Sequence, residues 1–238
     1  MSDKDLINKI PIYKLKTSDE VMKYYDDWGT NNKYDQDMVD WNYTGPKETS
    51  KLFNKYSSDK NIKIYDAGCG TGLVGVELKK YGFSNFFGAD LSQKLLDLVP
   101  KGLYTTLDKV DLNKPVNEKD SSFDAVMCVG TFTFGHVKPH ALNEFIRITK
   151  NKGLICFTIN EGIYEEYGFD KKIKELENIN EEHRKLNGEL RQEVEKLRGL
   201  SPELSKEISF PLEDADYAAA DELEDNFTEQ LSFKFNQE

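Results

Sequence analysis

The fold is decided by the stretch Ile62-Lys63-Ile64-Tyr65-Asp66-Ala67-Gly68-Cys69-Gly70-Thr71-Gly72. Its first half is rich in β-branched and aromatic residues, which is typical of a strand, and this strand ends in an acid. Glycine then takes every second position, and an apolar helical pattern follows. Glycine permits turns that are closed to other residues and lets a ligand approach the backbone, while the next helix points free N–H groups at the loop. The stretch therefore predicts the first strand, loop and helix of an α/β domain that holds a nucleotide-like cofactor.

Strands and helices alternate after this stretch, which predicts a Rossmann-like, doubly wound α/β fold with a mainly parallel sheet and helices on both faces. The expected strands are residues 62–66, 85–90, 103–106, 123–129 and 154–160. Ligands of such a sheet bind beyond the carboxyl ends of the strands. Polar or glycine residues fall at those ends: Asp66, Asp90, Asp111, Gly130 and Asn160. We therefore expect one binding site at this edge of the sheet.

The segments that flank this core differ from it in composition. Residues 1–17 are expected to form a flexible arm, and residues 18–57 an N-terminal helical cap dense in aromatic side chains. The cofactor-binding core is expected over residues 58–168. Residues 169–238 combine a long charged helix with an acidic tail, and weak strand patterns within the tail could complete the sheet. The helix either covers the sheet or pairs with a partner helix.

The charge of the chain is negative and unevenly placed. The formal net charge is −11. Residues 203–238 hold eleven acids and two lysines, a balance of −9, which leaves about −2 for the rest. Neither part shows the clustered basic face that a phosphate backbone requires, so nucleic acid is not expected as a substrate.

The composition also bears on location and on metal binding. The apolar runs are far shorter than the roughly 20 residues that span a bilayer, so no membrane segment is expected. The first residues are polar and lack the pattern of a signal peptide, which favours a cytoplasmic protein. Three cysteines, Cys69, Cys128 and Cys156, are too few and too scattered for a disulfide framework or a zinc site, so no metal is expected.

The glycine loop by itself fits two kinds of cofactor. Residues 70–75 satisfy the GxGxxG spacing of dinucleotide enzymes, and Asp90 lies at about the right distance. In that pattern, however, apolar residues run up to the first glycine, whereas here Asp66 closes the strand and Gly68 precedes the motif. A carboxylate is unfavourable beside a pyrophosphate but suits a cofactor with positive charge. S-adenosylmethionine carries a sulfonium and an ammonium group and no phosphate, so it is predicted over NAD.

The acids at the strand ends can be assigned to parts of this cofactor. Asp66 can serve the ammonium end, directly or through water, and Asp90 is placed to accept both ribose hydroxyls. Asp111 can take the adenine amino group while Leu112 packs against the ring. Aromatic faces attract cations, so some aromatic residues of the cap are expected to line the same pocket and to close over it.

The sequence resembles the class I S-adenosylmethionine-dependent methyltransferases. The resemblance covers residues 18 to about 178, and it is carried by Asp-Ala-Gly-Cys-Gly-Thr-Gly at 66–72, by Asp90 and by Phe-Asp-Ala-Val at 123–126. A narrower resemblance is to the methyltransferase-like proteins of the Williams-Beuren syndrome chromosomal region. It is carried by segments 25–28, 34–37, 70–75, 102–104, 129–132 and 135–137. After about residue 178 the chain lacks a clear match to the usual last two strands.

The resemblance implies an enzyme that methylates by in-line displacement, together with a set of site residues. The residues expected to bind the cofactor are Asp66, Ala67, Gly68, Cys69, Gly70, Gly72, Asp90, Leu91, Asp111, Leu112, Val129, Gly130, Tyr25 and Tyr34. The residues expected to contact the substrate are Trp28, Thr131, Phe132 and Phe134. His136 is the candidate general base, because it follows the fourth strand and has a suitable ordinary pKa; a structural role is the alternative.

Three classes of function stay open at this point. The first is a methyltransferase that acts on a small molecule. The second is a protein methyltransferase, whose acidic tail could recruit a basic partner. The third is a cofactor-binding module without catalysis. The acceptor and the oligomeric state do not follow from the sequence, because acceptor pockets are built from loops and caps.

Overall fold

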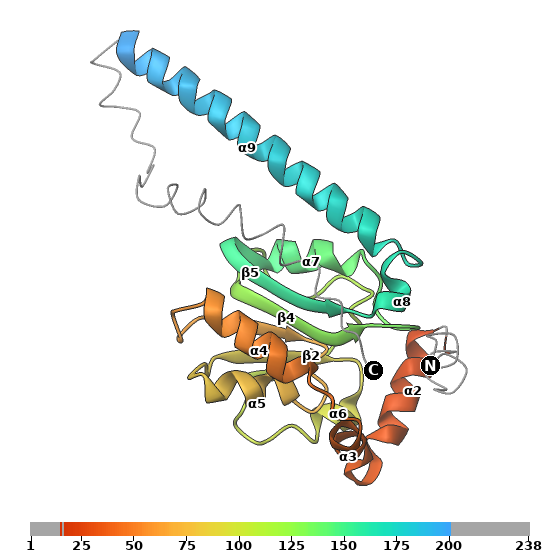
Figure 1. The fold of residues 1–238 in the computed structure, drawn as a ribbon. Helices are drawn as coiled ribbons and strands as arrows, with labels where there is room; N and C mark the ends of the chain where they lie inside the picture. Colours follow the sequence, from red (N-terminus) through yellow and green to blue (C-terminus); the bar gives the residue numbers. More distant parts are fainter. Residues whose placement is uncertain (1–14, 16, 201–238) are drawn as a thin grey trace. The chain divides into compact units, whose positions relative to one another are not determined.

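The computed structural model describes residue 15 and residues 17–200 of the chain (Figure 1). They belong to two compact units, which divide between Lys172 and Ile173. The first unit holds a five-stranded parallel sheet in the order β3-β2-β1-β4-β5. The strands are β1 (Ile64–Ala67), β2 (Phe86–Asp90), β3 (Thr106–Lys109), β4 (Phe123–Phe132) and β5 (Thr149–Ile159). This architecture confirms the predicted doubly wound α/β fold.

The strand order reverses between β1 and β4, which are neighbours at the centre of the sheet. Asp66 on β1 is paired in register with Gly88 on β2 and with Met127 on β4. A reversal of this kind leaves a crevice at the carboxyl ends of the two strands, because their connections run to opposite sides. The topology therefore places the glycine loop at the expected ligand site.

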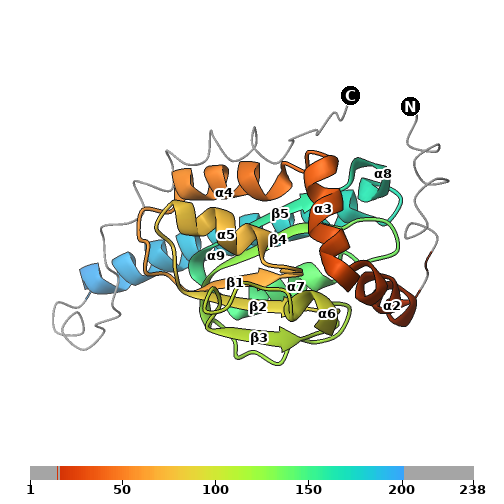
Figure 2. The ribbon, with the colours of Figure 1, turned by 90° about the horizontal axis from the view of Figure 1, so that it is seen from below.

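Helices flank the sheet, as Figure 2 shows. Phe53 of α4 (Gly45–Tyr56) and Leu78 of α5 (Leu73–Lys80) are buried in one core cluster with Ile64 and Met127 of the sheet. Phe145 of α7 (Ala141–Ile148) packs against Phe132, with ring centroids 5.9 Å apart. Two further helices are short: α6 (Gln93–Leu96) lies in the crossover from β2 to β3, and α8 (Glu161–Tyr164) follows the last strand, β5.

The third strand differs from its predicted position. Residues 103–106 were expected to form it, but β3 begins only at Thr106. The preceding segment is a turn, because Leu103 N donates to Pro100 O at 3.1 Å and Gly102 has a φ of +73°. Leu103 enters the core from this turn and not from a strand, so an apolar residue at this position does not indicate a strand.

Within residues 18–57, the range predicted for the N-terminal cap, α4 packs with the sheet, and the name cap is kept for the elements before it. These are α2 (Ser18–Trp28), the 3₁₀ turn η2 (Thr30–Asn32) and α3 (Lys33–Asp40). A capping box begins α2: the Thr17 side chain accepts from Glu20 N, and the Glu20 carboxylate accepts from Thr17 N at 3.1 Å. Aromatic rings hold the two helices together, with Trp28 and Tyr34 centroids 5.1 Å apart. The helices of the cap thus pack against each other through a small cluster of aromatic side chains.

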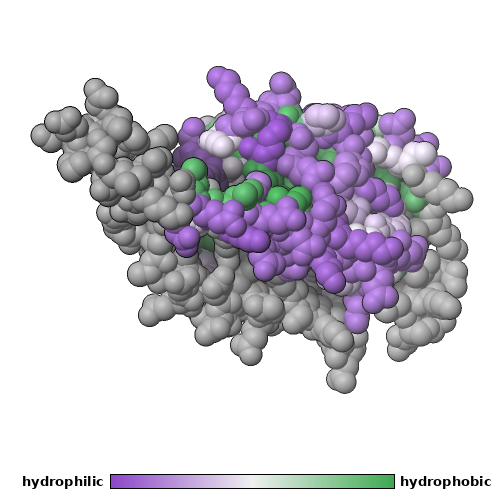
Figure 3. All heavy atoms as spheres, turned by 90° about the horizontal axis from the view of Figure 1, so that it is seen from above, coloured by the Kyte–Doolittle hydropathy of each residue, from purple (hydrophilic) through white to green (hydrophobic). Residues whose placement is uncertain are grey.

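The helix α9 (Phe169–Leu200) forms the described part of the second unit from Ile173 onward, and it lies in the range 169–238 where a long charged helix was predicted. Its apolar side chains include Ile179, Leu186 and Leu190, which are 42%, 60% and 63% exposed. Within the described part of the chain, none of the helices has the length and apolar character that crossing a membrane requires. The predicted arm up to residue 14, the acidic tail and its two weak strands lie outside the described residues. The surface seen in Figure 3 is mainly hydrophilic with small apolar areas.

Candidate functional site

A cavity of about 80 Å³ lies at the carboxyl edge of the sheet. The segments after β1, β2 and β3 and the end of β4 meet there with the cap helices α2 and α3. Most of the predicted site residues line it: Tyr25, Tyr34, Gly68, Gly70, Asp90, Leu91, Asp111, Leu112, Val129, Gly130, Thr131 and His136. Sequence reasoning missed others on the same wall: Ser18, Val21, Leu95, Val110, Asn113, Gly135 and Val137. Several of these are immediate chain neighbours of predicted residues, and that adjacency was the available signal.

Four of the predicted cofactor residues do not line the cavity. Asp66 and Ala67 are buried in β1, at 1% and 0% exposure. Cys69 is also buried, and burial raises the pKa of its thiol well above the usual range. Gly72 caps α5 with a φ of +89°, and a Cβ there would come within 3.2 Å of the Tyr104 ring. These residues shape the loop from beneath.

Three of the predicted substrate residues also lie away from the cavity surface. Phe132 is 1% exposed and packs with Phe145, Phe157 and Phe169. Phe134 is buried near Tyr167, with ring centroids 6.4 Å apart. Trp28 stacks on Tyr25 at 5.8 Å, so it supports a lining residue and does not line the cavity itself.

The end of β4 explains why Gly130 and Thr131 reach the cavity while Phe132 does not. The fourth strand was expected to end at residue 129, but β4 continues to Phe132 with a register shift after Cys128. Gly130 has a φ of +76° within this bulge, and its N–H donates to Thr158 Oγ1 at 2.8 Å. A bulge changes the side to which the following residues point, and this one turns the Phe132 ring into the core.

Asp90 is held in place by the loop that it supports. Its Oδ2 accepts from Gly70 N at 2.8 Å, and its Oδ1 accepts from Ser92 N at 2.9 Å. Burial raises the pKa of this carboxyl group, while those backbone N–H groups oppose the rise. A carboxylate oxygen has two lone pairs, so each oxygen can still accept a hydroxyl from a ligand.

Asp66 is in a different environment from Asp90. The Tyr104 hydroxyl donates to Asp66 Oδ2 at 2.5 Å, and Asp66 Oδ1 is buried with no hydrogen-bond partner among the residues that the structure describes. Burial raises the pKa of Asp66 to about 7; the Tyr104 hydroxyl lowers it and the Asp90 charge raises it further. An unpaired buried carboxylate oxygen is costly, so it favours a cation or a water as its partner.

His136 is joined to the cap across the cavity. Its Nδ1 lies 2.5 Å from Phe134 O, and its Nε2 lies 2.8 Å from the Tyr25 hydroxyl. A carbonyl oxygen only accepts, so Nδ1 carries the proton and Nε2 accepts from Tyr25. Burial and the nearby Lys138 charge lower the pKa of His136 to about 4, whereas the hydrogen bond to the Phe134 carbonyl opposes this shift. The imidazole is therefore neutral at pH 7.

Two carboxylates of the cap tie it to the loops of the core. Asp26 Oδ1 accepts from the Ser92 hydroxyl at 2.5 Å, beside the start of α6. Asp35 Oδ1 accepts from the Thr71 hydroxyl at 2.6 Å, within the glycine loop. The cap thus covers the cavity and contacts both loops that surround Asp90.

The polar atoms at this site fit S-adenosylmethionine. The unpaired Asp66 Oδ1 suits a cationic group, and Asp90 retains acceptor capacity for hydroxyls. Gly70 has a φ of +54°, and a Cβ there would meet only Leu95 Cδ1 at 4.0 Å, so the backbone is open to a ligand. Asp111 lines the cavity with Leu112, although Lys114 lies 3.3 Å from its Oδ2.

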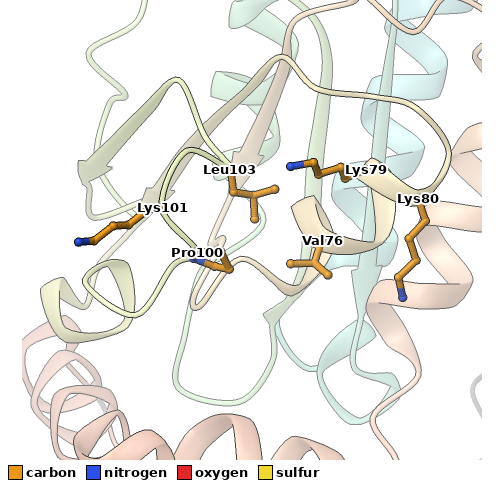
Figure 4. A pocket seen from close by; sticks show the side chains of 6 residues that line it. All are labelled: Val76, Lys79, Lys80, Pro100, Lys101 and Leu103. Carbon is orange, nitrogen blue, oxygen red and sulfur yellow. The ribbon is translucent and has the colours of Figure 1, made fainter.

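A second cavity, of about 330 Å³, is lined by Val76, Lys79, Lys80, Pro100, Lys101 and Leu103 (Figure 4). Lys80 is paired with Glu77, with Nζ 2.5 Å from Oε1. Figure 4 shows the side chains of Lys80 and Lys101 pointing away from each other. The lysines do not converge on one point, so this surface lacks the arrangement of an anion site.

Comparisons with known proteins agree with this geometry. The family model described as "Methyltransferase domain" matches residues 65–157, which include the glycine loop and Asp90. Human methyltransferase-like protein 27 is 33% identical over 141 residues, 58% of this chain and 56% of that protein. An uncharacterized protein of Methanocaldococcus jannaschii is 32% identical over 164 residues, 65% of this chain and 68% of that protein. The match thus spans little more than half of the human relative.

Solved structures of this kind were also found. One is a SAM-dependent methyltransferase from Thermotoga maritima, with 22% identity and a TM-score of 0.43 over 55% of this chain and 58% of that chain. The family match, the relatives and the parallel sheet with its glycine loop lead to one conclusion. The chain belongs to the class I S-adenosylmethionine-dependent methyltransferases, whose cofactor is S-adenosylmethionine.

Proposed function

We propose that the protein transfers a methyl group from S-adenosylmethionine to a nucleophilic atom of a small-molecule acceptor by in-line displacement. The observation that carries the proposal is the convergence of Gly68, Gly70, Asp90 and His136 on one covered cavity. When bound there, the cofactor supplies an electrophilic methyl group on a sulfonium. The chain contributes binding, alignment and the exclusion of water, which are the main demands of such a displacement.

Asp90 and the glycine loop are proposed to position the adenosine part. The carboxylate is fixed by Gly70 N and Ser92 N, so it presents its remaining lone pairs without losing side-chain entropy on binding. Leu112 offers an apolar surface for the adenine ring, and Asp111 an acceptor for its amino group. Asp66 is proposed to serve the ammonium group, directly or through water.

Tyr25 and His136 are proposed to handle the proton of the acceptor. If the nucleophile must lose a proton, the Tyr25 hydroxyl takes it while giving its own proton to Nε2 of His136, to which it is already hydrogen bonded. The pKa of His136, about 4, makes the imidazole a weak base. Alignment and water exclusion must therefore supply more of the rate than base strength.

The small-molecule acceptor is favoured by the cover over the cavity. Tyr25 and Tyr34 of the cap line it, and the cap contacts both neighbouring loops through Asp26 and Asp35. Small-molecule pockets occupy roughly 300–1,000 Å³, whereas this cavity holds about 80 Å³. The narrow covered space favours a small acceptor over a protein surface.

The test is methyl transfer from label-bearing S-adenosylmethionine into two fractions of a cell extract, metabolites below a small-molecule cut-off and intact proteins. Label in the metabolite fraction is expected with the wild-type chain and not with Asp90→Ala. Label confined to the protein fraction would overturn the small-molecule acceptor. Tight cofactor binding without transfer into either fraction would overturn catalysis and leave a binding module.

A further inference from the structure

Tyr104 reaches Asp66 from a distant part of the chain. It precedes β3, yet its hydroxyl donates to Asp66 Oδ2 on β1 at 2.5 Å. Among the described residues, Tyr104 is the one hydrogen-bond donor to the side chain of this buried carboxyl group.

The Tyr104 ring occupies a space that glycines leave free. A Cβ at Gly72 would lie 3.2 Å from its Cε2, and one at Gly88 would lie 2.9 Å from its Cδ1. A Cβ at Gly75 would lie only 2.6 Å from its hydroxyl oxygen. The three glycines come from the glycine loop, β2 and α5, so three elements are shaped to admit this side chain.

The surroundings of Asp66 make this hydrogen bond important for its ionisation. The titratable groups that act with it are Asp90 on β2, Cys69 in the loop, Cys128 on β4, Tyr65 on β1 and Tyr104. None of these groups carries positive charge. Burial, the largest cause, and Asp90 raise the pKa of Asp66, whereas the Tyr104 hydroxyl lowers it, to a result of about 7.

We propose that Tyr104 is a positioning residue for cofactor binding, which fixes Asp66 and stabilises the carboxylate form that a cationic cofactor requires. The inference rests on the proposed function, since it assigns Asp66 to the ammonium end of S-adenosylmethionine. Tyr104 itself does not line the cavity, so it acts through Asp66.

The test measures the dissociation constant of S-adenosylmethionine by isothermal titration at pH 6, 7 and 8 for the wild type and Tyr104→Phe. Loss of one hydrogen bond to a carboxylate raises its pKa by roughly one. Starting from a pKa of about 7, binding by the variant should be weaker by about ninefold at pH 6, about fivefold at pH 7 and about twofold at pH 8. The ratio of the two constants cancels the titration of the ligand's own amine.

The matched control is Tyr65→Phe, which removes a hydroxyl from the residue next to Asp66 on the same strand. Tyr65 is 2% exposed and packs against Phe123, with ring centroids 4.9 Å apart. Its variant should bind the cofactor like the wild type at every pH. A ratio for Tyr104→Phe that is near one, or that is the same at all three pH values, would overturn the proposal.

A second variant, Gly75→Ala, covers the case in which Tyr104→Phe fails to fold. Alanine suits a helix interior better than glycine, while the new Cβ must displace the Tyr104 hydroxyl. The same pH-dependent ratio is expected, and a constant ratio overturns the proposal. If the wild type binds no S-adenosylmethionine, the proposed function falls, and the inference falls with it; wild-type binding with unaffected variants overturns the inference alone.

Discussion

Replacement of Asp66 by asparagine should stabilise the ligand-free protein at pH 8 and leave it unchanged at low pH. The pKa of Asp66 is about 7 in the folded chain, against an ordinary value of 3.8. The folded state therefore binds more protons than the unfolded state between these values. Wild-type stability is fully retained below pH 3.8 and is lost as the pH rises through about 7, whereas the amide does not titrate.

The magnitude follows from the same two values. A gap of about 3 pH units, at 1.36 kcal/mol for each, gives about 4 kcal/mol as the largest penalty for ionising this carboxyl group in the folded chain. Asparagine keeps an oxygen that accepts from the Tyr104 hydroxyl. Its NH₂ group has no hydrogen-bond partner among the described residues, and neither does the O–H group of a protonated Asp66. We expect Asp66→Asn to raise the free energy of unfolding by about 2–4 kcal/mol at pH 8.

Urea unfolding of both chains at pH 5 and pH 8 checks this expectation. Asp124→Asn is the control of opposite sign: Lys150 and the Lys63 N–H hold the pKa of Asp124 below its usual range despite partial burial. That variant should lose stability at pH 8. A stability difference between Asp66→Asn and the wild type that is absent at pH 8, or equal at both pH values, would refute the reasoning.

Four other substitutions test the site and its support. Asp90→Ala should weaken S-adenosylmethionine binding by about 100-fold or more in isothermal titration, because an anchored double acceptor is lost; retained affinity would show that the ribose assignment is wrong. Gly68→Ala should lower the free energy of unfolding by more than 2 kcal/mol and Gly102→Ala by about 1 kcal/mol. Both glycines have positive φ, but only the Cβ at position 68 would collide, with Thr131, so equal losses in urea would contradict the contact. Arg147→Ala should cost about 1–3 kcal/mol in the same assay, since its guanidinium donates to two carbonyls and two carboxylates; unchanged stability would contradict this role.

Much of the fold and part of the site could be predicted because their determinants are local. The strand at 64–67, the glycine loop and α5 follow one another directly, so periodicity and glycine spacing suffice to predict them. Asp90 and Asp111 follow from the rule that parallel strands end at one edge. Residues that reach the cavity from elsewhere, such as Ser18 and Val21, carry no comparable signal in the sequence.

The sequence by itself determined the α/β rhythm, the cofactor loop and the identity of the acids around it, because each depends on residues close in the chain. Only the tertiary structure decided what those residues contact. Asp66 meets Tyr104 across 38 residues, and His136 meets Tyr25 across 111 residues. A bulge at the end of β4 turned Phe132 into the core. Such pairings depend on how strands and loops pack in space, and packing sets the burial that moves a pKa, so the ionisation of Asp66 and His136 could be read only from the folded chain.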